Sequence, residues 1–242
     1  MALNPNMSNK EVAELIFLNY KDKKPYMNLD FANVTTTDLT AERAYATGGV
    51  GAPNRVAFDS KRNGTLKIDT QIATMELFSM LSGSDLETSF KYAKRYELAA
   101  SAGKLTIPSS DTVVSGTINV FADGDDCGTA LEVTVADNEI TLPTETTTGN
   151  FIVYAIVNVD NGAKSVKFNS KNFPKAFVIH GETPWKTEDD EIATMHLAYY
   201  KAVPQSTFTL AFDNSNIISM SITCDLLADS DGNIYSMAIE EE

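Results

Sequence analysis

Apolar and polar residues alternate along most of this chain, which is the pattern of β-strands with one buried face. One such run is 218–227 (ISMSITCDLL), and clusters of Gly, Asn, Asp and Thr separate the runs as turns do. The pattern predicts a mainly β fold. Within 54–72 it predicts two strands joined at Asn63-Gly64, a hairpin signal, and it predicts two hairpin strands from Glu191 onward.

Helical spacing occurs in two places. Residues 73–82 carry apolar side chains at helical intervals and are followed by Gly83, a residue that ends helices in the left-handed conformation. Residues 8–20 show similar spacing, with Ser8 as their N-cap. We therefore expect a short helix in each. By contrast, residues 87–98 repeat aromatic and apolar residues at every second position, which favours a strand.

Residues 28–53 are rich in Thr, Ala and Gly and show little periodicity. A segment of this length without a clear element is unusual in a compact domain. We expect an extended arm or a long hairpin that a neighbouring molecule holds.

Composition changes at residues 105–163. This segment contains nine acidic residues and no Lys or Arg, and its short β patterns are separated by turn clusters. These features predict a small acidic β-sandwich module. The module would be inserted into a discontinuous core made of 1–104 and 164–242.

The sequence DSDGN, which begins at Asp229, raises the question of a calcium site. Aligning Gly232 with position 6 of an EF-hand loop places Leu227 and Ala238 at positions 1 and 12, where oxygen ligands are needed. Without those ligands, DSDGN is predicted to be a hairpin turn between the last two strands.

The chain has 242 residues and a formal net charge of −14. That charge argues against DNA binding through a basic stripe, and it does not exclude a protein that DNA passes without sticking. Cys127 and Cys224 are expected to be free thiols, since two cysteines do not form a disulfide framework. The N-terminus lacks the apolar stretch of a secretion signal, and residues 12–20 are too short to cross a bilayer. We expect a soluble protein made in a cytoplasm.

Catalytic motifs are absent from the sequence. His180 and His196 are its only histidines, and no Gly-x-Ser-x-Gly elbow occurs. The glycine loop at 48–51 lacks both the further small residue of a dinucleotide fingerprint, because position 54 is Asn54, and the Gly-Lys-Ser/Thr of a phosphate loop. No Cys-x-x-Cys spacing marks a metal site, and the one His-x-Glu triplet, His180 to Glu182, has no such cysteine pair to complete a zinc site. We predict a protein without enzymatic activity, catalytic residues, cofactor or metal.

Two stretches resemble bacteriophage tail tube (major tail) proteins from phages of Gram-positive hosts. Residues 28–85 contain an ATGG-x-G arm, an RVAF strand, the strand TLKIDTQI and a short amphipathic helix that ends in Leu-Ser-Gly. Residues 173–242 contain YYKAVPQSTFTLAF, a DLLAD-like strand end and a terminal Tyr-Ser-Met strand. The acidic stretch 105–163 resembles the β insertions of such proteins, so the resemblance covers nearly the whole chain.

The resemblance implies a β-sandwich or barrel-like fold with one helix at 73–82, in a structural protein of the virion tail assembled in the host cytoplasm. Six copies would form a ring with lumen strands from 55–72 and 191–222, and rings would stack through 1–20 and 35–55. The implied partners are the chain itself, tape measure and tail terminator proteins, and a sheath if the tail contracts. Viral DNA would pass through without specific binding, and no membrane is involved.

Other functions stay open on the sequence alone. One is another virion part, such as a capsid decoration protein or a capsid subunit. A second is a module that binds carbohydrate or calcium through 105–163. A third is a hydrolase that uses His180 or His196.

Overall fold

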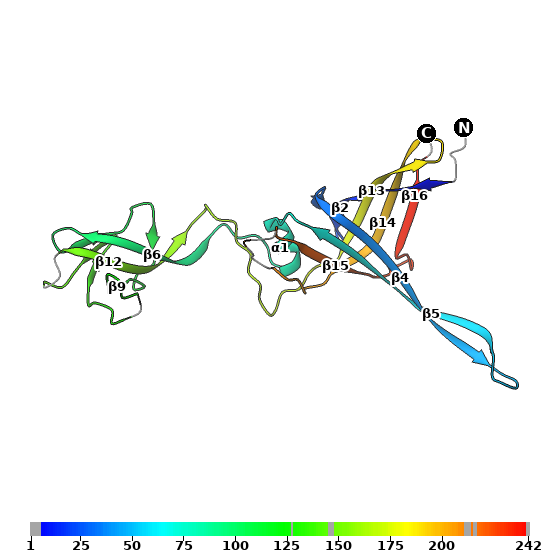
Figure 1. Ribbon diagram of the computed structural model, residues 1–242, viewed down its shortest axis with the longest axis horizontal. Helices are drawn as coiled ribbons and strands as arrows, with labels where there is room; N and C mark the ends of the chain where they lie inside the picture. Colours follow the sequence, from blue (N-terminus) through cyan, green and yellow to red (C-terminus); the bar gives the residue numbers. More distant parts are fainter. Residues whose placement is uncertain (1–5, 127, 145–147, 211–213, 215–216, 241–242) are drawn as a thin grey trace. The chain divides into compact units, whose positions relative to one another are not determined.

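The computed structural model describes residues 6–126, 128–144, 148–210, 214 and 217–240 (Figure 1). It contains two compact units, one made of Met1–Asp85 with Val166–Glu242 and the other of Leu86–Ser165. The fold is mainly β with one short helix, as predicted. In the described part of the chain, no sheet closes into a barrel.

The first unit is built on a nine-stranded sheet. Its order is β3-β2-β13-β14-β15-β5-β4, with β1 beside β13 and β16 beside β14, and the paired strands are antiparallel. The strands are β1 (Met7–Ser8), β2 (Glu14–Asn19), β3 (Pro25–Leu29), β4 (Ala32–Thr47), β5 (Asn54–Thr70), β13 (Phe177–Thr187), β14 (Ile192–Pro204), β15 (Met220–Leu226) and β16 (Tyr235–Ile239).

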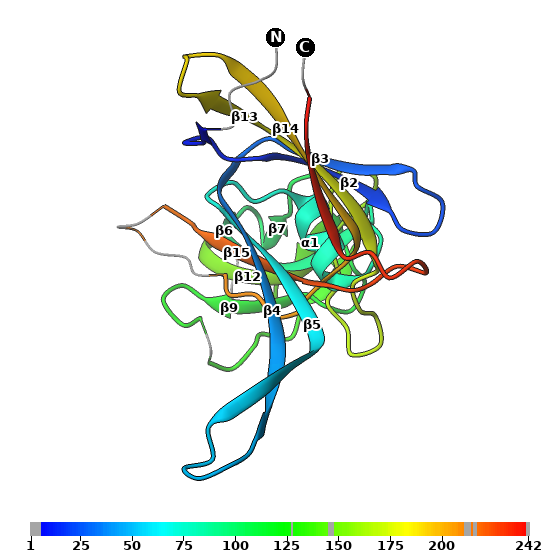
Figure 2. The same ribbon diagram turned by 90° about the vertical axis from the view of Figure 1, so that its right-hand side faces the viewer.

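This sheet folds over its own core (Figure 2). Leu15 of β2 and Ile179 of β13 are buried in the same cluster as Leu66 of β5. The Thr37 Oγ1 atom of β4 lies 2.7 Å from the Tyr199 hydroxyl of β14, although these strands are not neighbours in the sheet. The sheet thus forms two layers, a first layer of β2, β3, β13, β14 and β16 and a second layer of β4, β5 and β15.

Helix α1 (Met75–Ser82) confirms the helix predicted at 73–82. Its N-cap is Thr74, whose hydroxyl accepts a hydrogen bond from the Leu77 N–H at 3.2 Å. Gly83 ends it with φ = 67°, as predicted. A Cβ atom at Gly83 would lie 2.1 Å from the Phe173 carbonyl oxygen, so only glycine fits. The apolar face of α1 packs into the core of the first unit.

The helix predicted at 8–20 is wrong. The segment forms β1 and β2, and Leu15 and Phe17 are buried whereas Glu14 and Ile16 are exposed. Burial therefore alternates at every second residue, as in a strand with one buried face. Strand β2 pairs with β13 on one side and with β3 on the other. A short apolar run suits either periodicity, and strand pairing decides it here.

The turn predicted at Asn63-Gly64 is also wrong. Strand β5 runs without a break through both residues and pairs with β4 along its length. A Cβ atom at Gly64 would lie 2.9 Å from Leu39 Cδ2 and 3.0 Å from Leu226 Cβ. The glycine therefore permits a close approach inside a strand. The hairpin turn lies at 48–53 instead, so residues 28–53 supply the first strand and the turn of a long hairpin whose second strand is β5. The expected contact of this hairpin with a neighbouring molecule stays a prediction.

The second unit contains two small sheets around one apolar core. One has the order β6-β12-β8 with β9 beside β12, and the other has the order β10-β11-β7. The strands are β6 (Phe90–Ala100), β7 (Lys104–Thr106), β8 (Thr112–Val113), β9 (Asn119–Ala122), β10 (Thr134–Ala136), β11 (Glu139–Thr141) and β12 (Gly149–Val159). The strand predicted in 87–98 is confirmed as β6. Because β6 pairs with β12 along its whole length, this unit begins at Leu86 instead of residue 105.

The C-terminal part contains three strands where two were predicted. β15 and β16 flank the DSDGN turn, but they do not pair with each other among the described residues. Both pair with β14, β15 at residues 202–204 and β16 at residues 195–199. DSDGN therefore turns the chain between two strands that lie one after the other along the same neighbour.

Candidate assembly interface

The turn end of the β4–β5 hairpin projects from the sheet (Figure 1). We call residues 40–63 the ribbon. Strand β15 pairs with β5 only from Gly64 to Thr70, so in the described chain each ribbon strand has only the other as partner. Nearly every ribbon residue is exposed. An isolated two-stranded hairpin is marginally stable in water, so contact with a further surface would stabilise it.

Ion pairs within the ribbon set its register. Arg43 holds Asp59 on the opposite strand through two hydrogen bonds, Nε–Oδ1 at 2.5 Å and Nη2–Oδ2 at 2.9 Å. This guanidinium keeps the pKa of Asp59 below its usual range. Near the turn, the Arg55 Nε donates to the Gly48 carbonyl at 2.7 Å. The ribbon therefore has a defined conformation up to its turn.

One face of the ribbon is apolar. Ala44 lies opposite Phe58 and Ala46 lies opposite Val56, and side chains of directly opposed residues share a face. Phe58 is 59% exposed and Val56 is 50% exposed. The other face carries the Arg43–Asp59 pair and Tyr45, which is 52% exposed. Exposed apolar side chains gathered on one face of a projection are typical of an interaction surface.

The ribbon also differs from the rest of the chain in charge. It has four basic and two acidic residues, whereas the whole chain has 19 basic and 33 acidic residues. The basic residues are Arg43, Arg55, Lys61 and Arg62. Of these, Arg55 and Arg62 form no ion pair with a described residue. The ribbon is a basic projection on an acidic protein.

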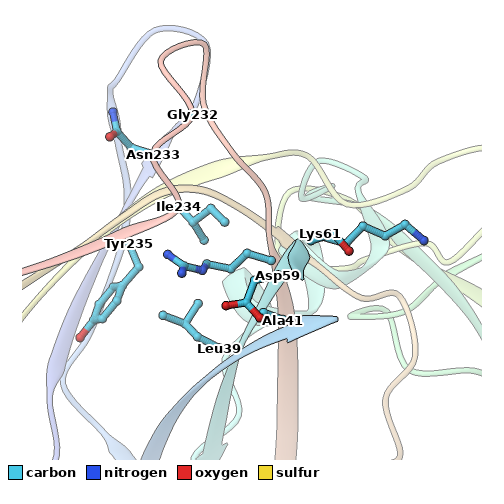
Figure 3. A pocket seen from close by; sticks show the side chains of 10 residues that line it. Leu39, Ala41, Asp59, Lys61, Gly232, Asn233, Ile234 and Tyr235 are labelled. Atoms are coloured by element: carbon cyan, nitrogen blue, oxygen red, sulfur yellow. The ribbon is translucent and has the colours of Figure 1, made fainter. Parts of the chain in front are cut away.

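A groove of about 510 Å³ lies at the base of the ribbon (Figure 3). Side chains of Leu39 and Asp59 line it from the hairpin, and Ile234 and Tyr235 line it from the segment before and at the start of β16. The carboxylate of Asp59 is already held by Arg43. The groove mixes apolar and charged groups and offers no unpaired carboxylate for acid–base chemistry.

Besides the two-residue strand β1, three strands of the first unit have a free edge. Within the described chain β3 pairs only with β2, β4 only with β5, and β16 only with β14. Unpaired strand edges are templates for pairing with another chain. The outward face of the second layer is polar except for Val34, and its polar members are Thr36, Asp38, Thr65, Lys67, Asp69, Ser221, Thr223 and Asp225.

The two histidines lie on the outward face of the first layer. Both are exposed, and the His196 Nε2 atom lies 3.2 Å from Glu240 Oε2. Glu182 stands directly opposite His196 on β13. No group of three His, Cys, Asp or Glu among the described residues could hold a metal ion.

The DSDGN turn uses its first carboxylate internally. Asp229 Oδ1 accepts hydrogen bonds from the backbone N–H groups of Asp231 at 2.9 Å and Asn233 at 2.8 Å, and Gly232 has φ = 85°. Cys224 is a buried free thiol, and burial raises its pKa to about 12. The other cysteine of the sequence, at position 127, lies outside the described residues.

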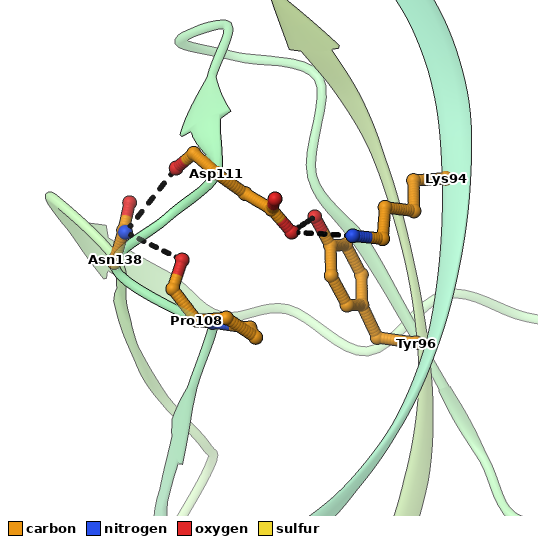
Figure 4. Close-up of polar contacts among 5 residues, drawn as sticks. All are labelled: Lys94, Tyr96, Pro108, Asp111 and Asn138. Carbon is orange, nitrogen blue, oxygen red and sulfur yellow. Dashed lines mark hydrogen bonds and ion pairs between the residues drawn. The ribbon is translucent and has the colours of Figure 1, made fainter.

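In the second unit, a polar cluster joins β6 to the loop before β8 (Figure 4). Asp111 Oδ2 accepts hydrogen bonds from Lys94 Nζ at 2.7 Å and from the Tyr96 hydroxyl at 2.8 Å. The Asn138 amide donates to the carbonyls of Pro108 and Asp111. Each of these four side chains has a hydrogen-bond partner inside the unit, so the role of the cluster is to hold this loop on the sandwich.

The two faces of the ribbon were not predictable from the local sequence pattern. Its apolar face depends on the register of Ala44 against Phe58, and that register becomes visible only with the turn at 48–53. The glycines of that turn, Gly49 and Gly51, have φ values of 91° and 82°. They were the available signal for the turn.

No helix among the described residues is long and apolar enough to span a membrane.

Comparison with known families gives one match. Residues 9–238 match the model of the YomU/Tube protein family. The match spans nearly the whole chain, and it agrees with the resemblance to phage tail tube proteins. No curated protein matches the chain.

Proposed function

We propose that this chain, which belongs to the YomU/Tube protein family, is the repeating subunit of a phage tail tube. Copies join through free strand edges into rings, which contain six copies if the resemblance to tail tube proteins holds for the ring as well, and the rings stack into a conduit for viral DNA. The protein acts as a structural part of the virion and not as an enzyme. Tape measure and tail terminator proteins, and a sheath in a contractile tail, are its further partners.

The observation that carries this proposal is the ribbon. A monomeric protein gains nothing from a marginal two-stranded projection with Phe58 and Val56 exposed on one face. In a stack of rings, the same projection reaches a neighbouring copy and buries that face. The free edges of β4 and β16 supply the lateral contacts within a ring.

The second layer is the proposed DNA-facing wall. Its outward side chains are short hydroxyl and carboxylate groups, and its Lys67 lies 3.2 Å from Asp69. Free lysines on such a wall would bind phosphates and release counterions, which would slow DNA. A polar wall with a slight negative charge lets the polyanion pass.

Purified protein tests the proposal directly. Sedimentation velocity should show oligomers that grow with concentration, and negative-stain microscopy should show rings or striated tubes. A protein that stays monomeric at every accessible concentration would rule out the tube.

A matched variant separates assembly from folding. Residues 42–61 are replaced by Asn-Gly, which closes a two-residue hairpin between Ala41 and Arg62. Its thermal unfolding should match that of the parent, because the ribbon lies outside the buried core, whereas its tubes should be lost. Immunogold labelling of phage particles then distinguishes a tail protein from a capsid decoration protein.

A further inference from the structure

The first unit carries an acidic groove on the outward face of its first layer. Two adjoining hollows of about 480 and 270 Å³ share Glu14 and Glu182. We call them together the acidic groove. Its lining contains three carboxylates, two histidines and no Lys or Arg, and the ionisable members are Glu11, Glu14, Glu182, His180 and His196.

Strand register brings like charges together in this groove. Glu14 of β2 stands directly opposite Glu182 of β13. Like charges at such positions are destabilising, and neither carboxylate forms an ion pair with a described residue. A cation placed between them would remove that repulsion. Ile16, which is 46% exposed, gives the groove an apolar floor.

The ribbon has the complementary properties. The ribbon is basic, whereas the groove is acidic. The ribbon also carries exposed apolar side chains, which could contact the exposed Ile16 of the groove. Arg55 stands near the ribbon's turn without a carboxylate partner among the described residues, and its bond to the Gly48 carbonyl fixes its position. Eight residues of strand extend about 25 Å, which is long enough to reach across to another subunit.

We propose that the ribbon of one copy docks in the acidic groove of a second copy, with Arg55 between Glu14 and Glu182. This inference rests on the tube function and identifies the acceptor surface of the ribbon. The contact joins two different surfaces, so each copy offers one ribbon and one groove. Such head-to-tail contacts repeat without closing, which is what stacking of rings requires.

Charge exchange tests the contact. The acceptor variant carries Glu14→Lys and Glu182→Lys, and the donor variant carries Arg55→Glu. Each alone should raise the concentration needed for tube formation at least about tenfold. A mixture of the two should assemble again, because each altered surface then meets a complementary one. Tube formation by the parent should weaken as salt increases.

Two controls support this test. A variant with Asp123→Lys and Glu132→Lys has the same charge change at exposed sites of the second unit, and it should assemble like the parent. The single Glu14→Lys variant places a lysine opposite Glu182, so it should fold at least as stably as the parent while assembling poorly.

The outcomes separate the two proposals. If the parent forms tubes and the acceptor variant forms them at the same concentration, the groove is not the acceptor, although the tube function stands. If the donor and acceptor variants both fail alone and their mixture also fails, the pairing of Arg55 with this groove is wrong. If the parent never assembles, both proposals fall.

Discussion

The hydroxyl of Tyr96 offers a sharp test of how the second unit is held together. Tyr96→Phe removes the hydrogen bond to Asp111 and leaves the ring packed in the core. A hydrogen bond to a charged group contributes about 1.5–3 kcal/mol. In this variant Asp111 still accepts the hydrogen bond from Lys94, and water can replace the lost hydroxyl. We therefore expect the free energy of unfolding of the second unit to fall by about 1–2 kcal/mol. For a unit of this size each kcal/mol lowers the Tm by about 4–8 °C.

The assay uses the position of the single tryptophan. Trp185 lies in the first unit, so its fluorescence reports unfolding of that unit, whereas hydrogen exchange at β6 and β12 reports unfolding of the second. Tyr96→Phe should speed exchange in the second unit and leave the Trp185 transition unchanged. Tyr92→Phe is the control, because Tyr92 lies on the same strand and is exposed. It should change the stability by less than about 0.5 kcal/mol.

The loss of stability caused by Tyr96→Phe should depend on pH in a defined direction. The Lys94 ammonium and the Tyr96 hydroxyl lower the pKa of Asp111. A carboxyl with a lower pKa in the folded state adds stability above the pKa of the unfolded chain, about 3.9, and loses it as pH falls through the folded-state pKa. The difference between Tyr96→Phe and the parent should be constant from pH 5 to 8 and shrink below about pH 4. Equal shifts in both units, or no shift in either, would refute this reasoning.

Three further predictions concern the first unit. Gly83→Ala should destabilise it by about 3 kcal/mol or more, measured by Trp185 fluorescence, because the left-handed φ and the close Phe173 carbonyl both oppose a Cβ. In a Cys127→Ser background, the Cys224 thiol should resist thiol reagents at pH 8 and react only when denaturant unfolds the unit, since burial raises its pKa to about 12. Phe58→Ser should leave the Tm unchanged and abolish tubes in negative stain.

Local sequence patterns were enough to predict an element where its own residues determine its conformation. Helix α1 was predictable from its spacing and from Gly83, which acts within the same turn. The strand character of β6 was predictable from alternation, and that of β12 from its run of β-branched and aromatic residues. In each case the residues of the element itself, and those next to it in sequence, determine whether it is a helix or a strand.

Local sequence patterns gave the wrong element where residues far away in the sequence determine the structure. The Asn63-Gly64 pair favours a turn locally, but Gly64 serves a close approach to Leu39 and Leu226, which no short window contains. Likewise Leu15 and Phe17 are buried because β13, more than 150 residues later, pairs with β2. The acidic groove was equally hidden, since Glu14 and Glu182 meet only in that register.

The three free edges of the sheet are not equally protected. Strand β3 begins with Pro25 and follows the lysine-rich turn 21–24, both of which discourage pairing at an edge. Strand β16 is only five residues long. Strand β4 has 16 residues and contains neither proline nor lysine. A long edge without these protections is an aggregation hazard for a protein that works alone, whereas in a ring it is the surface that the next copy covers. The asymmetry therefore favours β4 as the edge that begins lateral assembly.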